Sequence, residues 1–217
     1  MTTPEVDWVQ VALIVAVLVP SVILHEVSHG VVALWYGDDT AKRAGRLTLN
    51  PLRHIDPFGT VILPAILALS GLGAFGYAKP VPVQPNRLRS PRQHSLYVSL
   101  VGPAVNIVLA VVAVIVYRTF FESTRSGGVL FLDPSLAARA VFFFGVINVV
   151  LAVFNLLPIP PLDGSAMVER VLPERWWPAW LKVRKWSFGI LLLLVLAVPG
   201  ALGTVFRPFI DLYARVL

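Results

Sequence analysis

The stretch that decides the fold is Leu24-His25-Glu26-Val27-Ser28-His29-Gly30, which sets three ionisable side chains inside an apolar segment. This segment covers residues 8–36, and outside the cluster it is interrupted only by Gln10 and Pro20. At about 1.5 Å of rise per residue, a helix of this length crosses a bilayer and holds the cluster in its last third. Ionisable groups at lipid depth are costly unless they are paired or liganded, so the cluster indicates a functional site.

Composition points to lipid as the surrounding solvent. Of the 217 residues, 57% are hydrophobic and 14% are charged, whereas a soluble domain is about half apolar and a quarter charged. The net charge of +6 comes from basic loops beside apolar runs, which favours anionic lipid headgroups as the partner over nucleic acid. Cysteine is absent, which excludes disulfides, thiolate zinc sites and cysteine nucleophiles. Any metal must therefore be held by histidine and carboxylates.

Five apolar runs organise the chain. They predict an all-α polytopic membrane protein with about four to six membrane segments, formed as a single domain over residues 1–217. Its core is expected at residues 8–165, followed by an interfacial segment and a last helix, kinked at Pro199, within residues 166–217. The runs are residues 8–36, 58–78, 96–117, 136–157 and 187–206.

A small β-hairpin or re-entrant element is expected after the first helix. Residues 37–57 are polar, and Arg46-Leu47-Thr48-Leu49 alternates in the manner of a strand. We also expect residues 58–78 to enter and leave the membrane on one side. Without this, counting every run as a crossing would put His25 and Asp163 on opposite sides, and the basic loops would not all be cytoplasmic.

The spacing of His25 and His29 is that of a metal site. Four residues apart on a helix, their Cβ atoms lie about 5–6 Å from each other on one face, so both can reach one ion at about 2.0–2.1 Å. Glu26 projects about a quarter-turn away, where it can touch a metal-bound water and act as general base. The alternative, a solvated polar helix face, does not suit the apolar neighbours Ile23 and Val31.

A catalytic zinc ion needs a third protein ligand, and Asp163 is the prediction. Catalytic zinc usually takes three protein ligands plus water. Asp163 follows a helix stopped by proline, where non-helical backbone at membrane depth would line a cavity. It could instead cap a helix beginning at Ser165. His54, in a polar loop, is the rival ligand, or else a surface or supporting residue, whereas His94 is expected to be an interfacial histidine.

Three separated motifs together resemble the site-2 protease family of intramembrane zinc metalloproteases. They are His25-Glu26-Val27-Ser28-His29, Gly102-Pro103-Ala104-Val105-Asn106, and the stretch from Asn155 to Leu162-Asp163-Gly164. Gly45-Arg46-Leu47-Thr48-Leu49-Asn50-Pro51 is also similar to the family's membrane-associated β segment. We find no PDZ-like insertion and no CBS-like region, which longer members use for gating and substrate choice.

The resemblance implies one Zn²⁺ per chain on His25, His29 and Asp163, with Glu26 as general base. It suggests that Asn106 shapes the site by binding the substrate backbone or the oxyanion, although a buried asparagine between helices also serves as structural glue. Asn50 and His54 are further candidates for substrate or oxyanion binding.

The expected function is that of an intramembrane zinc metalloendopeptidase. It would hydrolyse peptide bonds in or near transmembrane segments, in regulated intramembrane proteolysis. The expected partners are a transmembrane-protein substrate and the lipid bilayer, and the expected location is a cell membrane, of bacterial plasma-membrane type, crossed several times.

A membrane metal carrier or transporter is the alternative, although it should have ligand pairs at several depths or a repeated half. A non-catalytic relative that binds transmembrane helices is the third possibility. The substrate and the oligomeric state stay open.

Overall fold

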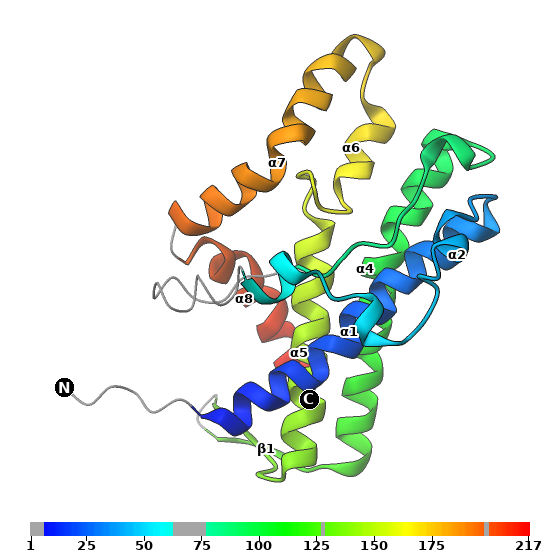
Figure 1. Cartoon of the computed structure of the whole chain (residues 1–217). Helices are drawn as coiled ribbons and strands as arrows, with labels where there is room; N and C mark the ends of the chain where they lie inside the picture. Colours follow the sequence, from blue (N-terminus) through cyan, green and yellow to red (C-terminus); the bar gives the residue numbers. More distant parts are fainter. Residues whose placement is uncertain (1–6, 63–76, 127–128, 198–199) are drawn as a thin grey trace.

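Three long helices form the body of the protein (Figure 1). The computed structural model describes residues 7–62, 77–126, 129–197 and 200–217. Among these, α1 (Trp8–Trp35), α4 (Pro91–Phe120) and α5 (Leu136–Leu156) are long and apolar enough to cross a membrane. Each packs against the other two. The predicted mostly helical architecture is confirmed, and three helices meet the requirements for a span.

The outer surface of the long helices is apolar. On α4, Val108, Val111 and Ile115 are about half exposed, and on α1 the same holds for Val11 and Val15. A band of this kind facing water would be unfavourable, at about 25 cal/mol per Å² of apolar surface. Against lipid it carries no such cost, so the exposed band and the composition together make this a membrane protein.

Shorter elements join and extend the three long helices. The loop after α1 contains α2 (Thr40–Arg43) and the short helices η1 (Pro51–Arg53), η2 (Pro57–Ile62) and η3 (Pro85–Arg87). Between α4 and α5, β1 (Ser123–Ser126) and β2 (Val129–Leu132) pair antiparallel, with Ser123 opposite Leu132. After α5 come α6 (Ser165–Val171), η4 (Glu174–Trp176), α7 (Trp177–Ala197) and α8 (Ala201–Val216).

The strand predicted at residues 46–49 is wrong. These residues form bends and irregular backbone, and the hairpin of the described chain lies between α4 and α5 instead. In a surface strand, Arg46 would face solvent. It is buried instead and donates from Nη2 to the carbonyl oxygen of Lys79 at 2.6 Å. This long-range contact outweighs the alternating pattern, since β-propensity depends on the partners a segment meets.

Helix ends follow local signals that the apolar runs do not contain. α4 begins five residues before its apolar run, with Pro91 in the first helical turn after Ser90. α5 ends at Leu156, where the prolines from Pro158 onward prevent a further turn. The last run, expected to be one kinked helix, divides into α7 and α8, with Gly200 in the left-handed conformation at φ +85°.

The two described ends of the predicted re-entrant segment lie side by side. The amide of Tyr77 donates to the carbonyl of Gly59 at 3.0 Å, and the Thr60 hydroxyl donates to the carbonyl of Tyr77 at 2.9 Å. Residues 63–76 of that segment lie outside the described residues. A single crossing would separate the two ends by about 30 Å, the thickness of the hydrocarbon core. The hydrogen bonds place the two described ends within bonding distance of each other.

Gly30 allows the loop after α1 to pack onto this helix. A Cβ atom at Gly30 would lie 2.5 Å from Leu47 Cδ2, 2.9 Å from Val81 Cγ1 and 3.0 Å from Ala41 Cβ. Three separate parts of the loop therefore meet α1 at one residue without a side chain.

We predict that Gly30→Ala destabilises the protein by about 1–3 kcal/mol, the usual cost of overpacking. Gly189→Ala is the matched control, because no atom of the described residues lies within 4 Å of a Cβ built there in α7. It should be neutral, or stabilising by up to about 1 kcal/mol, through helix propensity. Thermal unfolding in detergent, followed by tryptophan fluorescence, measures both. Equal midpoints for the two variants would contradict this account.

Candidate metal centre

The imidazoles of His25 and His29 converge from one face of α1. Their Nε2 atoms are 3.1 Å apart, and their ring planes are nearly perpendicular, at 86°. Both residues are buried. The helix α4 passes beside them at Gly102, where a Cβ atom would lie 2.5 Å from His29 Nε2 and 2.6 Å from His25 Cε1. The glycine of the second motif is therefore the residue that lets α4 back the histidine pair.

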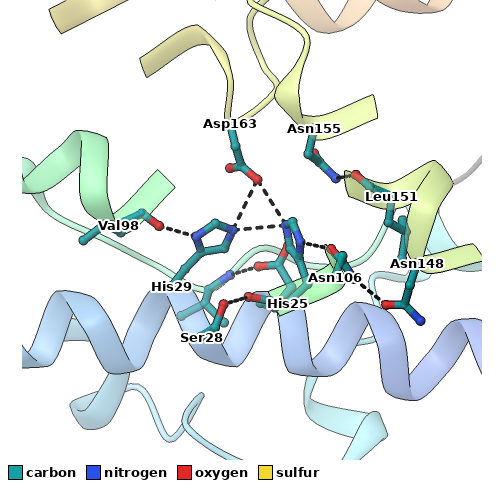
Figure 2. A network of polar contacts seen from close by, with 11 residues as sticks. His25, Ser28, His29, Val98, Asn106, Asn148, Leu151, Asn155 and Asp163 are labelled. Atoms are coloured by element: carbon teal, nitrogen blue, oxygen red, sulfur yellow. Dashed lines mark hydrogen bonds and ion pairs between the residues drawn. The ribbon is translucent and has the colours of Figure 1, made fainter. Parts of the chain in front are cut away.

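The carboxylate of Asp163 completes the group, as Figure 2 shows. Its Oδ2 atom lies 3.1 Å from His25 Nε2 and 3.4 Å from His29 Nε2. The alternative that Asp163 caps α6 is wrong, because the N-cap residue of α6 is Gly164. The Asp163 side chain instead points to the histidines.

The turn after α5 is folded back tightly to aim this carboxylate. The amide of Gly164 donates to the carbonyl of Asn155 at 2.6 Å. A Cβ atom at Gly164 would lie 2.3 Å from the carbonyl oxygen of Leu156, which is backbone and cannot move aside cheaply. The glycine after Asp163 is thus required by the close approach of two backbone segments.

Hydrogen bonds on the far side of each ring fix where the protons are. His29 Nδ1 donates to the backbone carbonyl of Val98 at 2.6 Å. His25 Nδ1 donates to Oδ1 of Asn106, also at 2.6 Å. A neutral imidazole with its proton on Nδ1 has a lone pair on Nε2. Both lone pairs therefore face the Asp163 carboxylate, which is the arrangement found behind metal-bound histidines.

Three acceptor atoms that face one another need a cation between them. Asp163 Oδ2 is buried and receives no hydrogen bond from a described residue. The separations of 3.1, 3.1 and 3.4 Å match the edge of about 3.3 Å that a tetrahedron has when the bonds to its central zinc ion are about 2.0–2.1 Å. The donor set of two imidazoles and a carboxylate is one that zinc accepts. Among the residues that the structure describes, this is the group that could hold a metal.

Glu26 is held next to this group by the backbone of a Pro-rich loop. Its Oε2 atom accepts a hydrogen bond from the amide of Val81 at 2.8 Å. Pro80 and Pro82 on either side have no N–H, so Val81 is the donor of this tripeptide. One carboxylate oxygen is thereby fixed, which leaves Oε1 to take up a proton.

The loop that presents Val81 is itself tied down at both ends. At one end, the amide of Lys79 donates to the carbonyl of His54 at 2.9 Å, and the carbonyl of Lys79 accepts from Arg46. At the other, the amide of Gln84 donates to Asp38 Oδ2 at 2.6 Å. Burial raises the pKa of Asp38, but hydrogen bonds from Thr40 and Gln84 outweigh it and hold that pKa below its usual value. Asp38 is therefore charged at neutral pH and remains an acceptor.

The other histidines and Asn50 lie apart from the metal group. His54 donates from Nε2 to the carbonyl of Thr48 at 2.9 Å, so the structure does not bring this rival ligand to His25 and His29. Asn50 accepts from the amide of Leu52 and caps η1. His94 stacks on Tyr36 and accepts from the amide of Ser90 through Nδ1. Roles for Asn50 and His54 with substrate stay predictions.

Sequence reasoning missed the groups that support the site from α4 and α5. Asn148 contacts Asn106 at the centre of α5, and it could have been noticed as one of two amide side chains in an apolar run. The backbone carbonyl of Val98 could not be singled out from the sequence, because every residue has a backbone carbonyl. The amide of Val81 was hinted at only by the prolines around it.

Comparison with known proteins agrees with the motifs. The family model described as peptidase family M50 matches residues 12–133 and 132–198. A protein of Bacillus subtilis named "Putative zinc metalloprotease YwhC" is 34% identical over 87% of this chain and 82% of its own length. The protein of Mycolicibacterium smegmatis named "Putative zinc metalloprotease Rip2" is 36% identical over 85% of this chain and 66% of its own. No solved structure matches. The prediction from the three motifs is thus confirmed: the chain belongs to peptidase family M50, the site-2 protease family.

Proposed function

We propose that this chain is an intramembrane zinc metalloendopeptidase that cleaves peptide bonds in or near transmembrane segments of other membrane proteins, in regulated intramembrane proteolysis. One observation carries the proposal: two imidazole nitrogens and one carboxylate oxygen, from opposite ends of the core, converge with their lone pairs facing inward, beside a glutamate. Membership of family M50 and the names of its relatives support the same reading.

The residues divide the chemistry between them. His25, His29 and Asp163 would hold a zinc ion, which supplies Lewis acidity to polarise a peptide carbonyl and acidify water. Glu26, anchored by Val81, accepts a proton from the attacking water at its free carboxylate oxygen. It then gives that proton to the departing amine nitrogen. The hydrogen bonds from Nδ1 of His25 to Asn106 and of His29 to Val98 keep both rings in place while this happens.

The depth of the site supports a transmembrane substrate. His25 precedes the end of α1 by ten residues, which is about 15 Å along the helix axis. A soluble peptide would have to enter hydrocarbon to reach this level. A transmembrane helix is already there, but its carbonyls are bonded within the helix, so it must unwind locally before cleavage.

We also propose four crossings of a bacterial plasma membrane, by α1, α4, α5 and the last apolar run at residues 187–206. His25 and His29 lie toward the end of α1, and Asp163 lies just beyond the end of α5, so both helices would end on one side. The amide of Arg89 donates to the carbonyl of Tyr36 at 2.9 Å, which ties the start of α4 to the end of α1. The contact between Gly59 and Tyr77 supports re-entry of residues 58–78.

The transporter alternative receives no comparable support. A carrier needs ligands at several depths along a path. Within the described part of the chain, one group of three or more metal-binding side chains meets, and it lies at one level.

Metal content is the first test of this function. We predict one zinc ion per wild-type chain and a loss of most of it in His25→Ala and Asp163→Ala, because either change removes a ligand. His54→Ala and His94→Ala are matched controls that should keep the metal. Elemental analysis of protein purified in detergent measures all five. Full zinc in both ligand variants, or none in the wild type, would remove the proposed function.

The proposed base gives a second test. Glu26→Gln should keep its zinc but lose at least a hundredfold in cleavage rate, the usual lower bound for removing a general base. Glu122→Gln, an exposed position after α4, should cleave as the wild type does. A set of fluorescent single-span peptides in proteoliposomes is the substrate. Near-normal cleavage by Glu26→Gln would take Glu26 out of this role.

The topology can be tested separately, since the chain contains no cysteine. Arg53→Cys and Arg89→Cys are both exposed and flank residues 58–78. We expect an impermeant thiol reagent to label both from the cytoplasmic side of oriented vesicles and neither from the outside. Labelling of the two positions from opposite sides would mean that residues 58–78 cross the membrane.

A further inference from the structure

We propose that Asn148 of α5 is a positioning residue that fixes the proton of His25 on Nδ1, acting through Asn106, and so sets the affinity of the site for a divalent metal. The inference rests on the proposed function only in taking His25 as a metal ligand. It concerns a side chain that does not touch the metal group, on a helix that contributes no ligand of its own.

A chain of buried polar side chains crosses from α5 to His25 (Figure 2). Asn148 donates from Nδ2 to the carbonyl of Phe144 at 2.8 Å and to the hydroxyl oxygen of Ser21 at 2.9 Å. Asn106 donates from Nδ2 to Oδ1 of Asn148 at 2.7 Å and accepts from His25 Nδ1 at 2.6 Å. Ser21, Asn106 and Asn148 have no solvent-exposed surface, so water cannot replace a lost partner.

The direction of this chain is dictated at its far end. A backbone carbonyl only accepts, so the NH₂ group of Asn148 must face Phe144. The Ser21 hydroxyl donates its proton to the carbonyl of Val17 at 2.8 Å, and its oxygen is therefore an acceptor for the same NH₂ group. Oδ1 of Asn148 must then face Asn106.

The same reasoning carries the direction on to the imidazole. Asn106 can satisfy Oδ1 of Asn148 only with its own NH₂ group, which turns its oxygen to His25. His25 must therefore hold its proton on Nδ1 and present a lone pair at Nε2. Each link excludes the flipped carboxamide, because a flip would bring two donors or two acceptors together in a place without water.

Without Asn148, the carboxamide of Asn106 would be free to flip. Its NH₂ group could then donate to His25 Nδ1, and the imidazole proton would move to Nε2. From there it would bond Asp163 Oδ2, which lies 3.1 Å away, and compete directly with a metal. His29 needs no such relay, because its Nδ1 faces the backbone carbonyl of Val98, which cannot flip.

Interhelical adhesion is the alternative role for these amides, and it makes a different prediction. Hydrogen bonds between spans stabilise helix packing by modest amounts. Loss of adhesion would lower the unfolding temperature in the absence of metal. This decrease would not depend on which atom of residue 106 faces His25. If Asn148 instead acts by placing the proton of His25, the zinc affinity lost without it should return when residue 106 is an acceptor that cannot turn into a donor.

The test compares zinc affinity among variants of the full-length protein in detergent, by competition with a chromophoric chelator. Asn148→Leu should bind zinc about 10–100-fold more weakly, the usual effect of losing a group behind a metal ligand. Ser21→Ala is the matched control. It removes one of the two acceptors of Asn148 and leaves Phe144, so its affinity should stay within about threefold of wild type.

The decisive variant combines Asn148→Leu with Asn106→Asp. A carboxylate accepts through either oxygen, so it should hold the proton on Nδ1 unaided and recover most of the lost affinity. Unfolding in chelator separates stability from binding, and Asn148→Ala replaces Asn148→Leu if the latter does not fold.

Wild-type affinity in folded Asn148→Leu, or no recovery in the double variant, would overturn the proposal while the proposed function stands. Absence of zinc from the wild type would instead defeat the proposed function.

Discussion

The structure depends on one close arrangement: two imidazole nitrogens and a carboxylate oxygen lie 3.1–3.4 Å apart and need a cation between them. Repulsion between lone pairs is strong where water cannot screen it. The protein holds the atoms there by fixing both imidazole protons on the far side of the rings and by folding the turn at Gly164 against backbone. A cation reverses the sign of the interaction, so binding of a metal and stability of the core are expected to be coupled.

The same constraint orders the helices around the site. His25 and His29 come from α1 and Asp163 follows α5, so their contact holds the ends of these two helices together, and α4 packs against both. Small residues make this possible, because Gly102 lets α4 lie beside the imidazoles and Gly30 lets the loop lie on α1. Close approach of this kind is how helices associate in lipid, where the hydrophobic effect does not drive them together.

The sequence predicted structure best at residues that have few physical roles open to them, such as ionisable side chains in apolar runs. The apolar helices α1, α4 and α5 and the meeting of His25, His29 and Asp163 could be predicted, because ionisable groups in apolar runs have few alternatives. The strand at residues 46–49 could not be judged, because its fate turned on a contact between Arg46 and Lys79, thirty-three residues away. Asn148 can be read in the sequence, but its contact with Asn106 forms only when three helices pack together. Local pattern does not contain such contacts.

The open side of the site follows from how its members are exposed. The side chains of His25 and His29 are 7% and 10% exposed, whereas that of Asp163 is 20% exposed. Beside the histidines, α4 closes the site at Gly102 and Val98, so the more open side of the group is that of Asp163. Water and an unwound substrate would then arrive from the side of Asp163 and of the loop that holds Glu26. That side lies toward the ends of α1 and α5. The proposed function needs such an open side, because His25 and His29 can stay buried while water and substrate reach them past Asp163.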